Sequence, residues 1–375
     1  MRKKFSMLLV STLAAVMMAG CGGDAKTETE VITSFESAPE QGEVGEVTKQ
    51  EATTTEPEEV VVEDVIPAGM YRSELTNELI SEEIKNQRPI AAMVDNDKRA
   101  LPHYGISQAD VVYEMMNSTA NSRITRLMVL VKDWDKIKQL GSIRSLRPTN
   151  ILLAAEWDAV VCHDGGPYHN DAYMKYINNF SGGFSRVNNG KAREFTEYIM
   201  TGDLQSRFKN SKISTEYRDT YEGGQHFNFA SETNPVDLSA ESLSQSASKV
   251  KLPFKNNGSY LVYDKETQTY DYFEHGSAHV DAGNGNKQTT FKNVILQDMT
   301  FNQLDENGYM IFNCIGGGNG WYMTNGTAIP IVWKKDSAYA MTRFYDMSGN
   351  EITMNTGKTY IALVPSDNFA SVVIE

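Results

Sequence analysis

The chain has 375 residues, which is too long for one small domain and makes two domains the default expectation. It is 40% hydrophobic and 22% charged with a mean hydropathy of −0.42, so a multi-span membrane protein is excluded. The formal net charge of −14 is concentrated in residues 24–67, where thirteen Asp or Glu face two Lys. A wide nucleic-acid surface needs a dense basic face, and no such run follows the first four residues, so nucleic acid is not expected as a partner.

Residues 1–20 have the order of a secretory signal peptide. Three basic residues, Arg2 to Lys4, precede an apolar stretch from Phe5 to Met18, which is shorter than the ~20 residues of a membrane-spanning helix. Cys21 then follows Ala19-Gly20, as in the lipobox of bacterial lipoproteins, although Met18 stands where that box usually has Leu. We expect palmitate or a similar acyl chain on Cys21 to hold the protein on the extracytoplasmic face of the cell membrane. A soluble secreted protein with an incidental Cys is the alternative.

Residues 21–84 are expected to form an acidic, disordered tether behind the lipidated Cys21. Thr, Glu, Gly and Ser dominate up to about Pro67, and such a stretch cannot bury enough apolar area to offset chain entropy. Its acidic charge would extend it and keep it off anionic lipid.

The pattern changes to short apolar runs from about residue 85, and an α/β domain with a mixed sheet is expected over 85–230. Strands are predicted at 89–94, 111–116, 124–131 and 159–162, a helix with Pro in its first turn over 148–156, and short helices over 194–200 and 204–208.

Residues 231–250 are Ser-rich and are expected to be a linker. Residues 251–375 then alternate strand-like runs with Gly-containing turns, which predicts a mostly antiparallel β-sandwich or partly open barrel. Gly316–Gly320 lacks the Lys and Ser/Thr of a phosphate-binding loop and is expected to be a flexible hairpin. Cys162 and Cys314, far apart in the sequence, are expected to be free buried thiols.

Charged residues interrupt the predicted strands of the first domain. Glu114 and Arg126 lie within apolar strands, and Asp95 and Asn96 directly follow a third strand. An unpaired buried charge costs several kcal/mol, so these residues need polar partners. The sequence therefore predicts a polar centre inside this domain.

The residues before the helix at Pro148 predict an anion-binding site. Arg144, Ser145 and Arg147 lie just before its first turn, where free backbone N–H groups carry partial positive charge. The planar fork of arginine suits phosphate or carboxylate. The structural alternative is that Arg144 or Arg147 pairs with Glu114 or Asp95 and closes the polar centre.

His163 and Asp164 follow another predicted strand, in the position where ligands of α/β sheets collect. Neighbours along an extended chain point in opposite directions, so Cys162 and His163 cannot form a nucleophile and base. His169 and Asp171 could converge on the same loop, but the spacing matches no established metal motif. We therefore expect no metal and no cofactor, and no catalytic residue is assigned.

Several segments together resemble the YerB-like family of bacterial lipoproteins, which has two domains of unknown function. The segments that carry the resemblance are Arg88–Asn96, Gly105–Glu114, Ile124–Met128, Gly141–Pro148, Ile331–Lys335, Thr342–Phe344 and Gly357–Ile361. The resemblance implies a lipid-anchored, extracytoplasmic protein and brings no established reaction. This chain departs from the family at Lys191-Ala192-Arg193-Glu194-Phe195, where members typically have a basic-Ala-Pro-His-Asn run.

The leading hypothesis is a non-catalytic envelope lipoprotein that binds an anionic ligand, either a cell-wall glycan or a phosphorylated envelope compound, or a partner protein of unknown identity. The alternative is a phosphoryl- or glycosyl-transfer enzyme acting on cell-wall precursors. In that case Arg144 and Arg147 would hold the phosphate, and Asp95 or Asp164 would act as base or metal ligand. A third interpretation makes every one of these charges a structural core pair.

Overall fold

The structure is a computed structural model that describes residues 65–221 and 223–375. The predicted signal peptide, Cys21 and most of the predicted tether lie outside the described residues. Regular structure begins with β1 (Met70–Arg72), which pairs antiparallel with β2 (Leu79–Ser81). Leu75, between these two strands, is fully buried. The structure thus differs from the tether predicted up to residue 84, because the last part of that segment has apolar side chains to bury.

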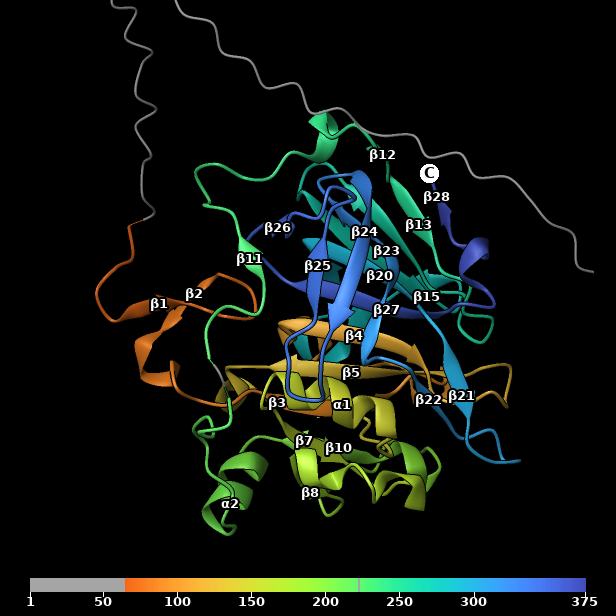
Figure 1. The fold of residues 1–375 in the computed structure, drawn as a ribbon. Coiled ribbons are helices and arrows are strands. Elements are labelled where there is room, and N and C mark those ends of the chain that lie inside the picture. Colours follow the sequence, from red (N-terminus) through yellow and green to blue (C-terminus); the bar gives the residue numbers. More distant parts are fainter. Residues whose placement is uncertain (1–64, 222) are drawn as a thin grey trace, which may run out of the picture. The chain divides into compact units, whose positions relative to one another are not determined.

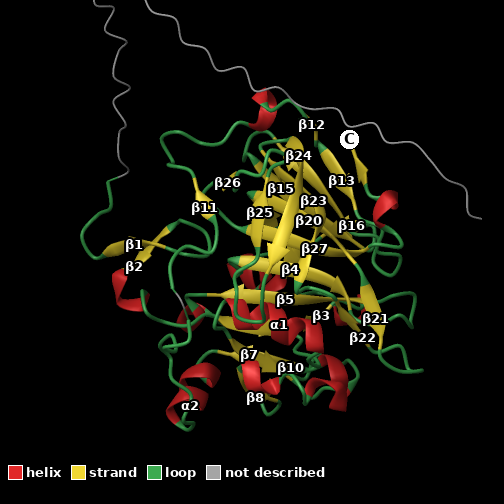
Figure 2. Cartoon of the chain, viewed as in Figure 1, coloured by secondary structure: helices red, strands yellow, loops and turns green. Residues whose placement is uncertain are grey.

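An eleven-stranded mixed sheet is the centre of the described fold (Figure 1, Figure 2). Its strand order is β12-β24-β23-β20-β27-β4-β5-β3-β7-β8, with β25 paired to β24. The bounds are β3 (Ile90–Asp95), β4 (Val111–Met116), β5 (Thr125–Val131), β7 (Val160–His163), β8 (Asn178–Ser181), β12 (Gln245–Ser246), β20 (Asn293–Met299), β23 (Gly316–Thr324), β24 (Thr327–Lys335), β25 (Arg343–Tyr345) and β27 (Thr359–Pro365). Strands β3, β4, β5 and β27 are buried along their whole length, because both faces of the sheet are covered.

A second sheet of six strands has the order β16-β15-β14-β13-β28, with β19 paired to β15. Its bounds are β13 (Lys249–Lys251), β14 (Tyr260–Asp264), β15 (Thr269–Glu274), β16 (Ser277–Ala278), β19 (Thr290–Phe291) and β28 (Val373–Ile374). The remaining strands form small sheets: β6 (Gln139–Gly141), β9 (Ser185–Arg186), β10 (Glu197–Met200), β11 (Asn228–Phe229), β17 (Val280–Asp281), β18 (Lys287–Gln288), β21 (Phe301–Gln303), β22 (Met310–Phe312) and β26 (Thr353–Met354).

Only two α-helices occur in the described part of the chain, α1 (Pro148–Glu156) and α2 (Asp203–Lys209). The 3-10 helices are single turns at Glu82–Ile84, Lys98–Ala100, Ile106–Gln108, Trp134–Lys136, Tyr168–Asn170, Met174–Tyr176, Arg193–Phe195, Leu238–Ala240, Ala282–Asn284 and Phe369–Ser371. The fold is therefore mostly β, and the first half is a mixed sheet with little helix rather than a regular alternation of strands and helices. No described helix has the length and apolar character needed to cross a membrane.

Strand β27 joins the two halves of the chain. It lies between β20 and β4 and runs parallel to both, so that Ile361 is opposite Ile295 on one side and Tyr113 on the other. Residues 85–230 and 251–375, expected as two domains, thus contribute strands to one sheet, and all described residues fall in one compact unit. The C-terminal strands extend this sheet and build the second sheet over it, instead of forming the expected separate sandwich or barrel.

Each face of the central sheet has its own hydrophobic core. One core contains the buried side of α1 together with Met93, Met128 and Ile361. The other lies between the central and the six-stranded sheet and contains Val94 and Tyr360. Because side chains alternate along a strand, neighbouring residues of β3, β5 and β27 supply opposite cores.

The secondary-structure predictions hold where the local sequence decides the structure and are wrong where tertiary contacts do. The helix predicted over 148–156 is present with those bounds. The helix predicted over 194–200 is wrong: a 3-10 turn at Arg193–Phe195 leads into β10, which pairs with β6. Cys162 and Cys314 are free and buried, as expected, and they belong to opposite cores.

The glycine run Gly316–Gly320 forms part of β23, between β20 and β24, and is not the predicted hairpin. The hairpin turn follows at Asn325-Gly326, where both residues have positive φ. A Cβ atom on Gly320 would overlap the carbonyl oxygen of Leu296 on β20. Glycine is needed there because the neighbouring backbone comes too close for any side chain.

We expect Gly320→Ala to lower the free energy of unfolding by about 1–3 kcal/mol, because the added methyl forces β20 and β23 apart. Urea unfolding followed by circular dichroism measures the change. Asn319→Ala, at the exposed neighbouring position of β23, is the matched control and should change stability by less than about 0.5 kcal/mol. Equal stability of the two variants would contradict the close approach at Gly320.

Candidate functional site

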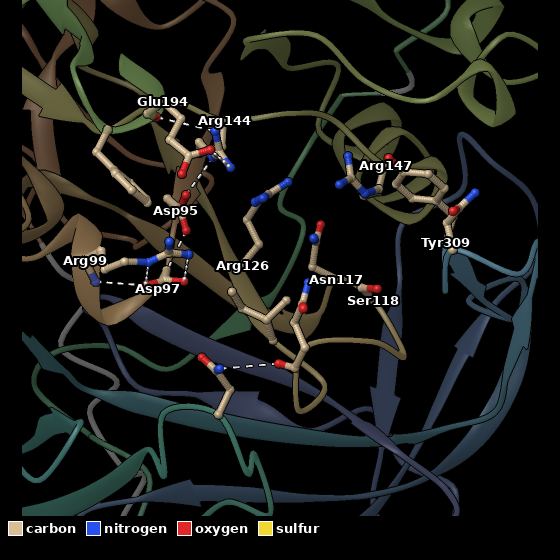
Figure 3. Close-up of a pocket in the computed structure, with 15 residues that line it drawn as sticks. Asp95, Asp97, Arg99, Asn117, Ser118, Arg126, Arg144, Arg147, Glu194 and Tyr309 are labelled. Atoms are coloured by element: carbon tan, nitrogen blue, oxygen red, sulfur yellow. Dashed lines mark hydrogen bonds and ion pairs between the residues drawn. The ribbon is translucent and has the colours of Figure 1, made fainter. Parts of the chain in front are cut away.

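A cavity of about 410 Å³ opens at the edge of the sheet where β3 and β4 end and β5 begins (Figure 3). Asp95 is the last residue of β3 and lies opposite Arg126 of β5 in the sheet register. Arg144 and Arg147 come from the segment before α1, and Arg147 is the N-cap residue of that helix. The structure thus brings four of the predicted site residues, Asp95, Arg126, Arg144 and Arg147, to one cavity.

Two arginines of the cavity are already paired with carboxylates. The Nε atom of Arg144 lies 2.6 Å from Oδ2 of the buried Asp95, and its Nη2 atom is 3.5 Å from Glu194. Arg99 forms an ion pair of 2.7 Å with Asp97, and its hydrogen bonds lower the pKa of that carboxyl. Arg144 therefore forms the structural ion pair with Asp95 that the sequence offered as the alternative to anion binding.

Arg126 has no carboxylate partner within ion-pair distance among residues 65–221 and 223–375. Its side chain is only 4% exposed, and its Nη1 atom donates to the carbonyl oxygen of Ser145 at 2.6 Å. The Nε donor is buried without a partner. Burial and the neighbouring guanidiniums of Arg147 and Arg144 lower its pKa to about 9.

Arg147 is the second cation of the cavity for which the described residues offer no carboxylate. It donates from Nη1 to the carbonyl oxygen of Leu146 at 2.9 Å, and its Nε donor is also buried without a partner. Its guanidinium lies over the ring of Tyr309, 4.9 Å from the centroid. Burial and the positive charge of Arg144 lower the pKa of Arg147 to about 10. In Figure 3 no dashed line joins Arg126 or Arg147 to an acidic residue.

The electrostatic result is a pair of neighbouring cations, Arg126 buried and Arg147 half-buried, with spare donors at an open cavity. The guanidinium of Arg147 lowers the pKa of Arg126 through repulsion, so an anion between the two would relieve the repulsion and accept the free N–H groups. Asn117 adds a side-chain carbonyl oxygen that is buried without a partner. The arrangement therefore suits a ligand that combines an anionic group with hydroxyl or amide donors.

Glu114 and Asn96 lie on the other face of the sheet, outside the cavity. The Glu114 carboxylate is fully buried and accepts hydrogen bonds from Asn96, Thr125, Asn257, Tyr272 and Tyr360. Tyr360 belongs to β27, and Tyr272 and Asn257 belong to the second half of the chain. The polar centre predicted for the first domain is in fact built from both halves, and its carboxylate has no arginine partner among the described residues.

The remaining predicted site residues also lie elsewhere. Ser145 gives Arg126 its backbone oxygen rather than presenting its hydroxyl group to the cavity. Both ring nitrogens of His163 are bonded, to Gly165 and Asn179, and Asp164 pairs with Arg186. His169 contacts Asp305 of the second half instead of joining His163.

The sequence did not single out most of the other residues that line the cavity. These are Arg99, Asn117, Ser118, Asn121, Ile124, Asn256, Asn307 and Tyr309, with Glu194 and Phe195 known only as part of the departing run. Asp97, which follows Asp95 and Asn96 after the third predicted strand, was expected as a partner of the charges in the strands, and Arg99 follows two positions later. Asn256, Asn307 and Tyr309 come from the second half and carry no local signal. Glu194 and Phe195 lie in the run where this chain departs from the YerB-like pattern, so that departure falls at the cavity.

The fold and the cavity define a β-rich protein with a cationic pocket shared by two halves of one chain. Residues 75–214 match the "Protein of unknown function (DUF3048) N-terminal domain" and residues 250–361 match the corresponding C-terminal domain. The chain belongs to this family.

One relative is the "Putative lipoprotein YerB" of Bacillus subtilis (strain 168), which is 24% identical over 323 residues, covering 82% of this chain and 91% of the relative. The crystal structure of YerB from Bacillus subtilis superimposes with a TM-score of 0.68 at 20% identity, covering 81% of this chain and 99% of that one. This likeness confirms the mostly β fold.

We expect Glu114→Gln to lower the free energy of unfolding by about 1–3 kcal/mol, because the amide N–H₂ would face hydroxyl and amide donors that need an acceptor. Urea unfolding is the measurement. Asp367→Asn removes a carboxylate from the exposed pair with Arg123 and should cost less than about 1 kcal/mol. A smaller effect at Glu114 than at Asp367 would contradict the buried network.

Proposed function

We propose that this protein is a lipid-anchored envelope lipoprotein on the extracytoplasmic face, and that its cavity binds an anionic group of a cell-wall glycan or phosphorylated envelope compound. The observation that carries the proposal is the pair Arg126 and Arg147, one buried and one half-buried guanidinium at an open cavity, each with a buried unpartnered Nε donor and with no carboxylate partner among the described residues. The signal-like N-terminus with Cys21 and the likeness to a lipoprotein support the location.

The physical reason is the cost of burying charge. Removing a guanidinium from water without a counter-charge costs several kcal/mol, and the two cations here repel each other. A phosphate or carboxylate accepts bidentate hydrogen bonds from such a fork and restores the lost solvation. Volumes of about 300–1,000 Å³ are typical of small-molecule sites, so the cavity has room for a sugar ring next to its anionic group.

The ion pairs of the carboxylates favour ligand binding over group transfer as the function of the cavity. Asp95, the base of the alternative enzyme hypothesis, is held by Arg144 at 2.6 Å, and Asp97 is held by Arg99. Asp164 lies outside the cavity and pairs with Arg186. Glu194, the remaining carboxylate of the cavity, is exposed and lies 3.5 Å from Nη2 of Arg144, so every described carboxylate of the cavity already has an arginine partner.

We expect inorganic phosphate, a hexosamine 1-phosphate or glucuronate to bind the full-length chain and raise its thermal midpoint, with at least one of them stabilising it by about 2.7 kcal/mol at one hundred times its Kd. Arg147→Gln should weaken binding at least about tenfold, because one charged hydrogen bond contributes more than 1.4 kcal/mol. Calorimetric titration and thermal shift measure both effects. Binding should weaken with added salt.

Arg123→Gln is the matched control for this experiment, because Arg123 pairs with Asp367 on the surface and does not line the cavity. Its affinity should equal that of the parent chain. If all three probes fail to bind the parent, or if Arg123→Gln and Arg147→Gln lose affinity equally, the proposed site is refuted.

We expect Cys21→Ser to abolish incorporation of a clickable palmitate analogue in cells, because the serine hydroxyl cannot replace the thiol that is acylated. Cys162→Ser should keep the label, since that thiol is buried in the folded body. In-gel fluorescence after labelling gives the readout. A label that persists in Cys21→Ser would contradict the lipid anchor.

A further inference from the structure

A second buried cluster lies behind the cavity, where the two halves of the chain meet. It consists of His103 from the segment after β3, Glu274 at the end of β15, and His279 between β16 and β17. All three side chains are almost fully buried. The Nδ1 atom of His103 is 2.7 Å from Nε2 of His279, and Oε1 of Glu274 is 3.9 Å from the first and 3.7 Å from the second.

These three atoms lie close enough together to bind one ion, and the two ring nitrogens are hydrogen-bonded to each other. A position equidistant from atoms separated by 2.7, 3.9 and 3.7 Å lies about 2.0 Å from each of them, and Zn–N bonds are about 2.0–2.1 Å long. Two histidines and one carboxylate are a common ligand set for divalent transition metals. The three residues thus have both the chemistry and the spacing for one ion.

The outer bonds of the two histidines orient the rings toward this point. Nε2 of His103 lies 2.6 Å from the carbonyl oxygen of Asp95, and a carbonyl oxygen only accepts. Nε2 therefore carries the hydrogen, and the lone pair of Nδ1 faces the cluster. Nδ1 of His279 is bonded to the hydroxyl group of Thr289 at 2.8 Å. Metal-binding histidines usually have such a second partner on the outer nitrogen.

A buried carboxylate oxygen without a hydrogen-bond partner is the second, independent observation at the cluster. Oε1 of Glu274 is buried without a hydrogen-bond partner. Its other oxygen accepts from Asn257 and Tyr272, which also donate to Glu114, so two buried carboxylates share their donors. Within the described ranges, no Lys or Arg lies within ion-pair distance of either carboxylate.

We propose that His103, His279 and Glu274 bind one divalent transition-metal ion, with Zn²⁺ as the preferred ion. The ion neutralises the buried carboxylates and links the segment after β3 to β15 and β17. Because His103 also binds the backbone of Asp95, the site fixes one wall of the cavity from behind. The three ligands are closed off from solvent, so the ion stabilises the junction of the two halves.

The test uses the full-length chain, purified with a tag free of histidine and stripped with a chelator. We expect the stripped protein to bind one equivalent of either Zn²⁺ or Co²⁺ at the same site and to gain thermal stability on binding. Bound Co²⁺ should give visible d–d absorption, which should disappear when Zn²⁺ displaces it. Elemental analysis of the unstripped protein should show about one metal ion per chain. No anionic ligand is added, so the result is independent of the proposed function.

Ligand variants make the test specific. Glu274→Gln and His279→Gln should lose the Co²⁺ spectrum and the thermal stabilisation by Zn²⁺, whereas Thr289→Ala should weaken affinity about 10–100-fold. His169→Gln, outside the cluster, and Arg147→Gln, in the cavity, should bind metal like the parent. Circular dichroism of the metal-free variants verifies that each is folded. Absence of stoichiometric binding in the parent, or unchanged affinity in Glu274→Gln and His279→Gln, would overturn the proposal.

Discussion

The parallel pairing of β27 with β4 is the constraint on which the rest of this structure depends. A strand near the C-terminus lies between β20 and the first half of the chain, so neither half completes its sheet alone. The same contact carries a polar interaction, because Tyr360 of β27 donates to Glu114 of β4. Backbone and side-chain bonds therefore fix one register, and a shift by one residue would turn every apolar side chain of β27 toward the wrong core.

That shared sheet creates two polar centres on its opposite faces. On one face, Asp95 and Arg126 open into the cavity with Arg144 and Arg147. On the other, Glu114 and its donors lie beneath the six-stranded sheet, next to Glu274 and the two histidines. Alternation of side chains along β3, β4 and β5 separates the positive centre from the negative one by the thickness of a single sheet.

Asp95 connects these two centres. Its carboxylate holds Arg144 at the cavity, and its carbonyl oxygen accepts from His103 of the histidine cluster. Asp95 has little conformational freedom because both its carboxylate and its carbonyl oxygen are bonded. The Arg144 side chain that pairs with it therefore forms a fixed wall of the cavity. Arg126 and Arg147 are held only through backbone carbonyl oxygens and an aromatic ring, which leaves their charge available. The cavity thus contains one arginine that builds the site and two that can bind.

The amino-acid sequence by itself determined strands β3, β4, β5 and β7 of the central sheet and the helix from Pro148, because local apolar runs and proline act within a few positions. It also identified Arg126, Arg144 and Arg147, since charges within or beside apolar strands need a stated partner. It could not decide that Glu114 faces away from those arginines, that Gly316–Gly320 is a strand, or that Tyr309 and His279 meet residues of the first half. Those outcomes depend on contacts between segments that are distant in the sequence, such as β23 with β20 and β4 with β27 across more than two hundred positions, and only the tertiary structure brings these segments together.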